Sequence, residues 1–176
     1  MEKLEDYMEN RGTFEGPDEK LYKVEGKTTI RTKEGKAAVR EAIQKLADQE
    51  AVNPLQPSEG LSKAAQAHAK DVSKSGMIDS KGSDGSTVKE RLRRHGKIVK
   101  CYGESMAFLE ETAEDIVIQL LISDGNAERK HRDNIFRPDF GVIGVSSQEM
   151  PTELKRITVI NYAYKFLKED DQDPIK

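Results

Sequence analysis

The order of two hydrophobic patterns along the chain predicts an α+β fold. Apolar residues with helical spacing come first, as in Val39, Ala42, Ile43 and Leu46 at positions i, i+3, i+4 and i+7. Strand-like runs follow, mixed with further helical segments. The strand-like runs are residues 98–109, 140–146 and 157–166. This order predicts helices layered around one central sheet.

The length predicts one domain with two charged ends. A chain of 176 residues has enough apolar surface to form a core without covalent staples. Residues 1–33 are interrupted by glycines and are predicted to be a partly ordered arm, with short strands at 21–24 and 28–32. We expect the domain to span residues 34–167, and the charged tail 168–176 to fray.

Composition argues against several classes of protein. The 29 basic and 32 acidic side chains nearly cancel, so a nucleic-acid partner is disfavoured. No run of apolar residues reaches the length of a transmembrane segment. The acidic start, MEKLEDYMENRG, does not have the pattern of a signal peptide, which indicates an intracellular protein or a mature or trimmed form. The single cysteine, Cys101, excludes an intramolecular disulfide.

Two helices are predicted in the first half of the domain. The first should run from about Lys33 to about Glu50, before Pro54. Ser58 is a candidate N-cap for the second, which should end near Gly76. One face of this second helix carries mainly small residues, which indicates close packing. The face consists of Leu61, Ala64, Ala65, His68 and Val72.

The middle of the chain alternates polar turns with apolar segments. A loop rich in turn formers, 79–86, precedes Thr87 and Glu90, a capping-box pair for a short helix through His95. Gly103 and Glu104 interrupt the strand 98–109 and indicate either a bulge or a close approach of another group.

The second half of the domain adds a helix and a hairpin. Thr112 with Asp115 resembles a weaker capping box that opens the apolar helix 116–122. The last two strands should be joined by a polar hairpin around residues 149–153.

The stretch from Ser123 to Val145 is predicted to deliver a histidine to the mouth of the sheet. It contains Lys130, His131 and Arg132, and Asn134 follows. We interpret it as a loop or short helix that runs into a strand.

Four motifs occur in a specific order. They are Leu61 to Asp71 (LSKAAQAHAKD), Gly82 to Ser86 (GSDGS), Gly103 to Ser105 (GES) and His131 to Phe136 (HRDNIF). Together they resemble the CAP superfamily of cysteine-rich secretory, antigen 5 and pathogenesis-related proteins, and most closely its disulfide-free bacterial and protist members. The resemblance covers about residues 36–166. It implies an α-β-α sandwich with a central, mainly antiparallel sheet and a cleft of two histidines and acidic residues.

The resemblance assigns two cleft residues directly. His131 corresponds to the second cleft histidine, and Glu104 to the acid of the family's Gly-Glu-Asn segment, in which Ser105 replaces the asparagine. Asn134 belongs to the same cleft region.

Two other cleft positions depart from the family pattern. Ser80 or Lys81 stands where the first histidine is expected, and Ser123, next to Asp124, stands where the second acid is expected. In the family the cleft histidines can hold a divalent metal. Zinc in catalytic sites takes three protein ligands, so we expect a degenerate metal site, with His131 as the one candidate ligand, and no cofactor.

Each candidate also has a purely structural interpretation. His131 could polarise a ligand or simply fix its loop through a backbone hydrogen bond. Glu104 could act as a general base, although a buried carboxylate paired with Lys, Arg or His131 is the favoured interpretation. His68 is interpreted as a core or boundary histidine, and His95 as a favourable charge at a helix end. No serine lies in a nucleophile turn.

These observations lead to three functional hypotheses. The first is a non-enzymatic CAP-domain protein that binds a partner or a sterol or fatty acid, outside the cell or at its surface as the resemblance implies. The second is a protease-like hydrolase that uses His131 and Glu104. The third is a scaffold used through its surface loops.

Overall fold

The computed structural model of the protein describes residues 1–27, 29–168 and 171. The chain forms two compact units. The first unit contains Met1–Ala51 and Val117–Asp133, and the second contains Val52–Ile116 and the described residues from Asn134 onward. Each unit therefore combines segments that are distant in the sequence.

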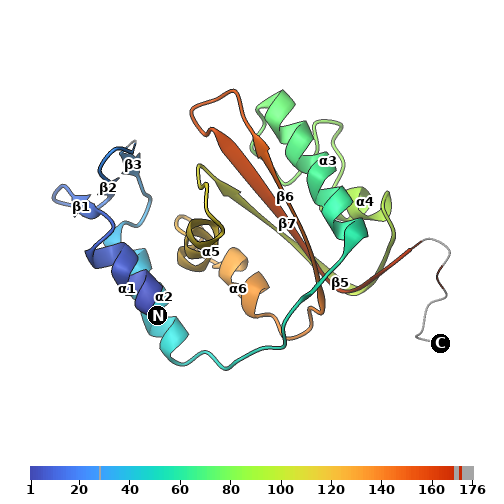
Figure 1. The fold of residues 1–176 in the computed structure, drawn as a ribbon, viewed down its shortest axis with the longest axis horizontal. Coiled ribbons are helices and arrows are strands. Elements are labelled where there is room, and N and C mark those ends of the chain that lie inside the picture. Colours follow the sequence, from blue (N-terminus) through green and yellow to red (C-terminus); the bar gives the residue numbers. More distant parts are fainter. Residues whose placement is uncertain (28, 169–170, 172–176) are drawn as a thin grey trace. The chain divides into compact units, whose positions relative to one another are not determined.

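The first unit is built on two helices and a small antiparallel sheet (Figure 1). Its N-terminal elements are α1 (Glu2–Glu9), β1 (Thr13–Glu15), β2 (Leu21–Lys23), β3 (Ile30–Arg31) and α2 (Lys36–Ala47). Tyr22 stacks on Tyr7 at 4.5 Å between ring centroids and contacts Phe14 at 4.8 Å. The buried core consists of Leu4, Ala38, Val39, Ala42, Ile118 and Ile122.

Much of the predicted arm has regular structure. Strand β2 lies inside the predicted segment 21–24, and β3 inside 28–32, of which Thr28 is outside the described residues. Helix α1 is not among the predicted elements. Its Leu4, Tyr7 and Met8, which pack into the core, have the helical spacing i, i+3, i+4.

The second unit contains the central sheet. Its strands are β4 (Gln56–Pro57), β5 (Lys97–Phe108), β6 (Val142–Glu149) and β7 (Arg156–Leu167), in the order β4-β6-β7-β5. The β5–β7 and β6–β7 pairs are antiparallel, and the short β4–β6 pair is parallel. The predicted α+β class and mainly antiparallel sheet are confirmed. The two-residue strand β4, which contains Pro57, was not predicted.

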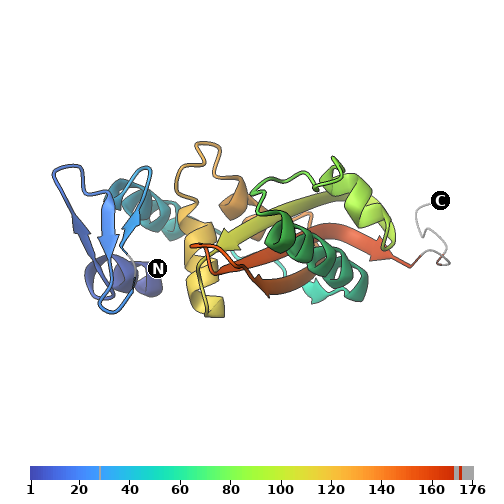
Figure 2. The ribbon, with the colours of Figure 1, turned by 90° about the horizontal axis from the view of Figure 1, so that it is seen from above.

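Helix α3 (Glu59–Ser75) covers one face of this sheet (Figures 1 and 2). Ser58 caps its N-terminus by accepting a hydrogen bond from Leu61 N, and Gly76 ends it in a left-handed conformation, as predicted. The predicted small-residue face is buried, and it packs on Ile157, Val159 and Ala163 of β7.

The small residues let helix and sheet approach closely at Gly144 of β6. A Cβ atom at this glycine would lie 2.2 Å from the backbone of Leu61 and Ser62. Only glycine fits this contact without a shift of the backbone.

The three remaining helices are α4 (Val88–Arg93), α5 (Ala113–Ile122) and α6 (Lys130–Phe136). The capping box of Thr87 and Glu90 is confirmed, although α4 ends at Arg93, before the predicted end at His95. Thr112 accepts a hydrogen bond from Asp115 N at 3.1 Å, which is one half of the predicted capping box, and α5 begins at Ala113, before the predicted start at Ile116. No helix of the described residues is both long and apolar enough to cross a membrane.

The predicted interruption of β5 is partly confirmed. The register shift lies between Val99 and Tyr102, not at Gly103 and Glu104, which pair regularly with Tyr162 and Asn161. Lys100, inside the shift, has a φ of 64°. The close approach does occur at Gly103, because a Cβ there would lie 2.8 Å from Asn134 Oδ1.

The predicted hairpin between the last two strands is present. The pair next to its turn is Glu149 with Arg156, and the pairing continues to Val142 with Ala163. Of the tail 168–176, only Lys168 and Asp171 are described, and Lys168 N donates to Asp171 Oδ2. The prediction that this tail frays otherwise lies outside the described residues.

We predict that Gly144→Ala lowers the free energy of unfolding by about 3 kcal/mol or more, because overpacking against a helix backbone cannot be relieved by a rotamer change. Denaturant unfolding followed by circular dichroism measures this. Gly85→Ala is the matched control, since that site has open space and a φ of 80°, and it should cost only about 1 kcal/mol. Equal losses in the two variants would contradict the close contact.

Candidate functional site

A buried ion pair holds Glu104, one of the predicted site residues. Glu104 projects from β5, and both of its carboxylate oxygens accept hydrogen bonds from Arg91 Nη2 of α4, at 2.7 and 2.9 Å. The two side chains are 5% and 8% exposed. Burial of a carboxylate is costly unless it is paired and hydrogen-bonded, so Arg91 accounts for the position of Glu104.

Arg91 also binds the polar loop 79–86. Its Nη1 donates to the backbone carbonyls of Ser80, at 2.6 Å, and Ser86, at 3.1 Å. One guanidinium therefore joins the start and the end of the loop to strand β5.

Two further side chains contact Glu104. Asn161 lies opposite it on β7, and with its amide oriented to satisfy its neighbours it donates to Glu104 Oε2 at 3.1 Å and accepts from Ala65 N at 3.1 Å. His68 Nε2 of α3 lies 3.8 Å from Glu104 Oε1. The carboxylate is thus surrounded by groups from α3, α4 and β7.

The low exposure of the cluster shifts its ionisation. Burial, and then the charge of Arg91, lower the pKa of His68 from 6.5 to about 4, although Asp71 and the Asp79 backbone act in the opposite direction. Burial raises the pKa of Glu104, and Arg91 only partly offsets this effect. At neutral pH His68 is therefore uncharged.

Ser105 and Asn134 form a second polar contact beside the ion pair. Asn134 Nδ2 donates to Glu104 O and to Ser105 Oγ, both at 3.1 Å. Burial raises the pKa of Tyr162 to about 12, while a hydrogen bond with Ser105 acts in the opposite direction. Ser105 is buried, and its hydroxyl therefore holds the Asn134 side chain against β5.

Ser80 and Lys81 are exposed in the loop. The Ser80 hydroxyl lies 3.4 Å from Asp79 Oδ1, and Lys81 N donates to the same oxygen at 2.9 Å. The loop is also fixed by Asp71, which accepts hydrogen bonds from the backbone and hydroxyl of Ser83. The structure thus joins Ser80 to Glu104 through Arg91.

His131 and Ser123 belong to the first unit. His131 lies in the first turn of α6 and is partly buried, which lowers its pKa. Ser123 is buried, and its backbone has a φ of 50° just after α5. Its Oγ has no hydrogen-bond partner among the described residues.

Ion pairs hold this segment of the first unit in place. Arg129 donates to both carboxylate oxygens of Glu34, and Arg132 donates to Glu41 of α2 at 2.6 Å. Asp124 accepts hydrogen bonds from the backbone N–H groups of residues 33 and 34. These contacts fix the start of α6, which carries His131.

The sequence did not identify Arg91, Asn161, Arg129 or Arg132 as members of these clusters. A signal existed for Arg91, because a buried glutamate requires a cationic partner and α4 immediately precedes β5. For the others the pairing depends on tertiary contacts between segments that are distant in the sequence.

The residues around Glu104 do not fit a divalent metal. Both Glu104 oxygens accept hydrogen bonds from Arg91, whose positive charge would repel a cation, and His68 is the imidazole beside them, because Ser80 and Lys81 supply none. Among the described residues, no group of three or more His, Cys, Asp or Glu side chains is arranged to hold a metal ion.

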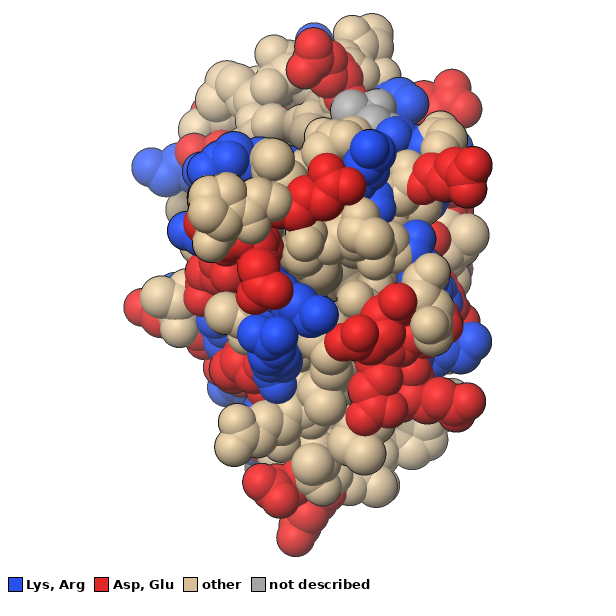
Figure 3. Space-filling view, turned by 90° about the vertical axis from the view of Figure 1, so that its left-hand side faces the viewer, with Lys and Arg blue, Asp and Glu red and all other residues tan. Residues whose placement is uncertain are grey.

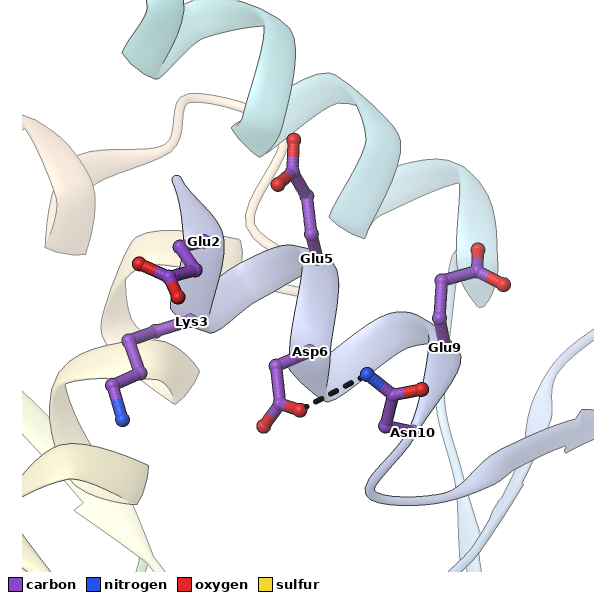
Figure 4. Close-up of a pocket in the computed structure, with 6 residues that line it drawn as sticks. All are labelled: Glu2, Lys3, Glu5, Asp6, Glu9 and Asn10. Atoms are coloured by element: carbon purple, nitrogen blue, oxygen red, sulfur yellow. Dashed lines mark hydrogen bonds between the residues drawn. The ribbon is translucent and has the colours of Figure 1, made fainter.

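A surface depression of about 440 Å³ lies elsewhere, on α1 of the first unit (Figure 4). Glu2, Lys3, Glu5, Asp6, Glu9 and Asn10 line it. Its walls are polar, and Asn10 donates to Asp6 at 3.1 Å. Figure 3 shows acidic and basic side chains interspersed on the visible face. The depression is therefore lined by charged and polar residues, whereas a hydrophobic ligand needs mainly apolar side chains around it.

Comparisons with known proteins place this geometry in context. The family model described as "CAP: Cysteine-rich secretory protein family" matches residues 23–162. The uncharacterized protein YkwD of Bacillus subtilis is 31% identical over 94 residues, which are 53% of this chain and 35% of that protein. The chain thus spans about a third of this relative's length.

Two solved structures share the fold. An extracellular protein containing an SCP domain from Bacillus anthracis has a TM-score of 0.51 and 18% identity, over 74% of this chain and 38% of that one. An outer surface protein from Borrelia burgdorferi has a TM-score of 0.53 and 19% identity, over 73% of this chain and 86% of that one.

We predict that Arg91→Ala lowers the free energy of unfolding by about 3–5 kcal/mol, because it leaves Glu104 buried without its cation. Arg94→Ala on the same helix is the matched control. Arg94 pairs with Asp84 at 2.9 Å, but both side chains are more than half exposed, so its loss should cost about 1 kcal/mol or less. Chemical denaturation measures the free energy of unfolding of both variants. Similar losses would show that the buried ion pair contributes no more to stability than the exposed one.

Proposed function

The chain belongs to the CAP family, and we propose that it is a non-enzymatic member that binds a partner or a small hydrophobic ligand of the sterol or fatty acid class. The match over residues 23–162 supports the family. The choice between binding and hydrolysis rests on the site.

The hydrogen bonds that Glu104 already accepts are the observation that carries the proposal. A general base must offer a free oxygen within hydrogen-bond reach of the proton that it removes. Both oxygens of Glu104 already accept hydrogen bonds from Arg91, and the side chain is almost fully buried. This arrangement suits a structural carboxylate better than a catalytic one.

The other predicted site residues support the same conclusion. Ser105 is buried and bonded to Asn134, so it is not placed to attack a substrate. Ser80 and Lys81 replace the imidazole of the family pattern, and neither can act as a neutral nitrogen base in its place. His68, which lies beside Glu104, is buried, so the proposal assigns polar contact with a bound molecule to His131, which is only partly buried.

An extracellular or cell-surface location is part of the proposal. The similar solved structures are described as an extracellular protein and an outer surface protein. A role in binding at the cell exterior is consistent with these descriptions and with the family name.

For hydrolysis, we predict that a panel of esters and peptides shows no turnover that depends on His131. Purified wild type should give the same background rate as His131→Ala, because Glu104 is not free to assist the imidazole. His95→Ala, which removes a histidine near the end of α4, is the matched control. Turnover that is lost in His131→Ala and kept in His95→Ala would contradict a non-enzymatic function.

For ligand binding, we predict a one-to-one complex with a sterol or a fatty acid, observed by native mass spectrometry and by titration with a fluorescent sterol and a fluorescent fatty acid. His131→Ala should weaken this binding, whereas His95→Ala should not. Absence of binding to both lipid classes would contradict the hydrophobic-ligand part of the proposal. Binding to a protein partner would then be the remaining function.

A further inference from the structure

We propose that two copies of this chain associate through strand β6, with residues 145–149 of each copy paired antiparallel about a two-fold axis at Ser147. The two four-stranded sheets then join into one continuous sheet. This inference concerns one edge of the sheet and does not depend on which ligand the protein binds.

The open part of the sheet edge lies on β6. Strand β4 pairs with β6 only at Val142 and Ile143. Ser58 N donates to Ile143 O, so the backbone groups of Ile143 point away from β7. These groups alternate between the two sides of an antiparallel strand, and the pairing of β6 with β7 is continuous. The N–H and C=O groups of Val145 and Ser147 therefore also point outward, and they have no partner strand among the described residues.

The opposite edge of the same sheet has features that block a further strand. Strand β5 has a register shift between Val99 and Tyr102, and the exposed Lys100 lies inside it with a φ of 64°. The Asn134 side chain donates to a backbone carbonyl of the same strand. Irregular pairing and lysines are common protections of a sheet edge. Residues 144–148 of β6 contain no charged residue, proline or register shift, so this edge is open to a partner strand.

The side chains on this edge suit pairing with an identical strand. Val145 is 47% exposed, and Ser147 and Glu149 are also exposed. Antiparallel pairing about Ser147 puts each Val145 opposite Glu149 of the second copy and brings the two Ser147 side chains together. The two Glu149 carboxylates then lie on opposite sides of the axis, about 13 Å apart along the strands. This separation exceeds the Debye length at physiological salt, so the dimer places no like charges in contact.

Two limits fix this register. A parallel in-register arrangement, or an antiparallel one centred on Glu149, places the two Glu149 side chains next to each other, and like charges at directly opposite positions are destabilising. An arrangement centred on Val145 drives the second copy into β4, which occupies the edge at Ile143. At its other end, β6 stops at Glu149, whose carbonyl accepts a hydrogen bond from Ser73 Oγ at 2.6 Å. The same segment of a second copy therefore fits between these limits without any further strand.

Sedimentation velocity of the full chain tests the association from about 10 µM to about 1 mM, because an interface of this length is at the small end of known interfaces. We expect a reversible shift from monomer to dimer within this range. Amide hydrogen exchange of Val145 and Ser147 should slow about tenfold when about 90% of the chain is dimeric. Ser146, whose N–H points toward β7, should keep its exchange rate. A chain that stays monomeric throughout, or a dimer that leaves the exchange of Val145 and Ser147 unchanged, overturns the proposal.

Charge variants at the axis assign the contact to this strand. Ser147→Lys and Ser147→Glu each place two like charges face to face, so each variant alone should stay monomeric over the same range. An equimolar mixture should form a one-to-one heterodimer, because lysine then faces glutamate. Thr13→Lys is the matched control. Thr13 is exposed on β1, an outer strand of the small sheet, and this variant should dimerise like the wild type.

The variants also separate this contact from a contact elsewhere. A dimer that persists in both Ser147 variants forms through another surface and rejects the proposal. Circular dichroism shows whether each variant keeps the wild-type fold. If both variants are folded and monomeric but their mixture gives no heterodimer, the axis at Ser147 is wrong. If neither variant folds, the hydrogen exchange of the wild type decides alone.

Discussion

The need to pair one buried carboxylate organises the second unit. Glu104 sits in the sheet at a position where water cannot solvate it, and Arg91 supplies both the opposite charge and the hydrogen bonds. The same guanidinium reaches two loop carbonyls. Strand β5, helix α4 and the loop between α3 and α4 are therefore positioned by one interaction, and Asn161 and His68 complete its surroundings.

Close packing makes this arrangement possible. The alanines of α3 and Gly144 of β6 allow the helix to lie directly on the sheet backbone, which brings His68 within 3.8 Å of Glu104. A larger residue at these positions would push the helix away and admit water to the ion pair. The apolar contacts and the buried charges thus depend on each other. Glu104 and His68, two polar residues of the family motifs, are therefore part of the packed interior.

The sequence predicts the elements with strong local signals. Ser58 and Gly76 mark the ends of α3, Thr87 and Glu90 mark the start of α4, and the apolar runs mark β6 and β7. Helix α1 and strands β1 and β4 were not predicted, because α1 is short and charged and the two strands have only three and two residues. For the site, the need of Glu104 for a partner was predictable, but its identity as Arg91 depends on how α4 returns beside β5.

The contacts of Asp124, Arg129 and Arg132 have a consequence for the order of folding. They join residues 33, 34 and 41 to a segment 90–95 positions later in the chain. The N-terminal helices and strands therefore leave the ribosome well before the segment that completes their core, including Ile118 and Ile122. Contacts of such long sequence separation form slowly, so the N-terminal elements cannot complete their core until residues 117–133 have been synthesised.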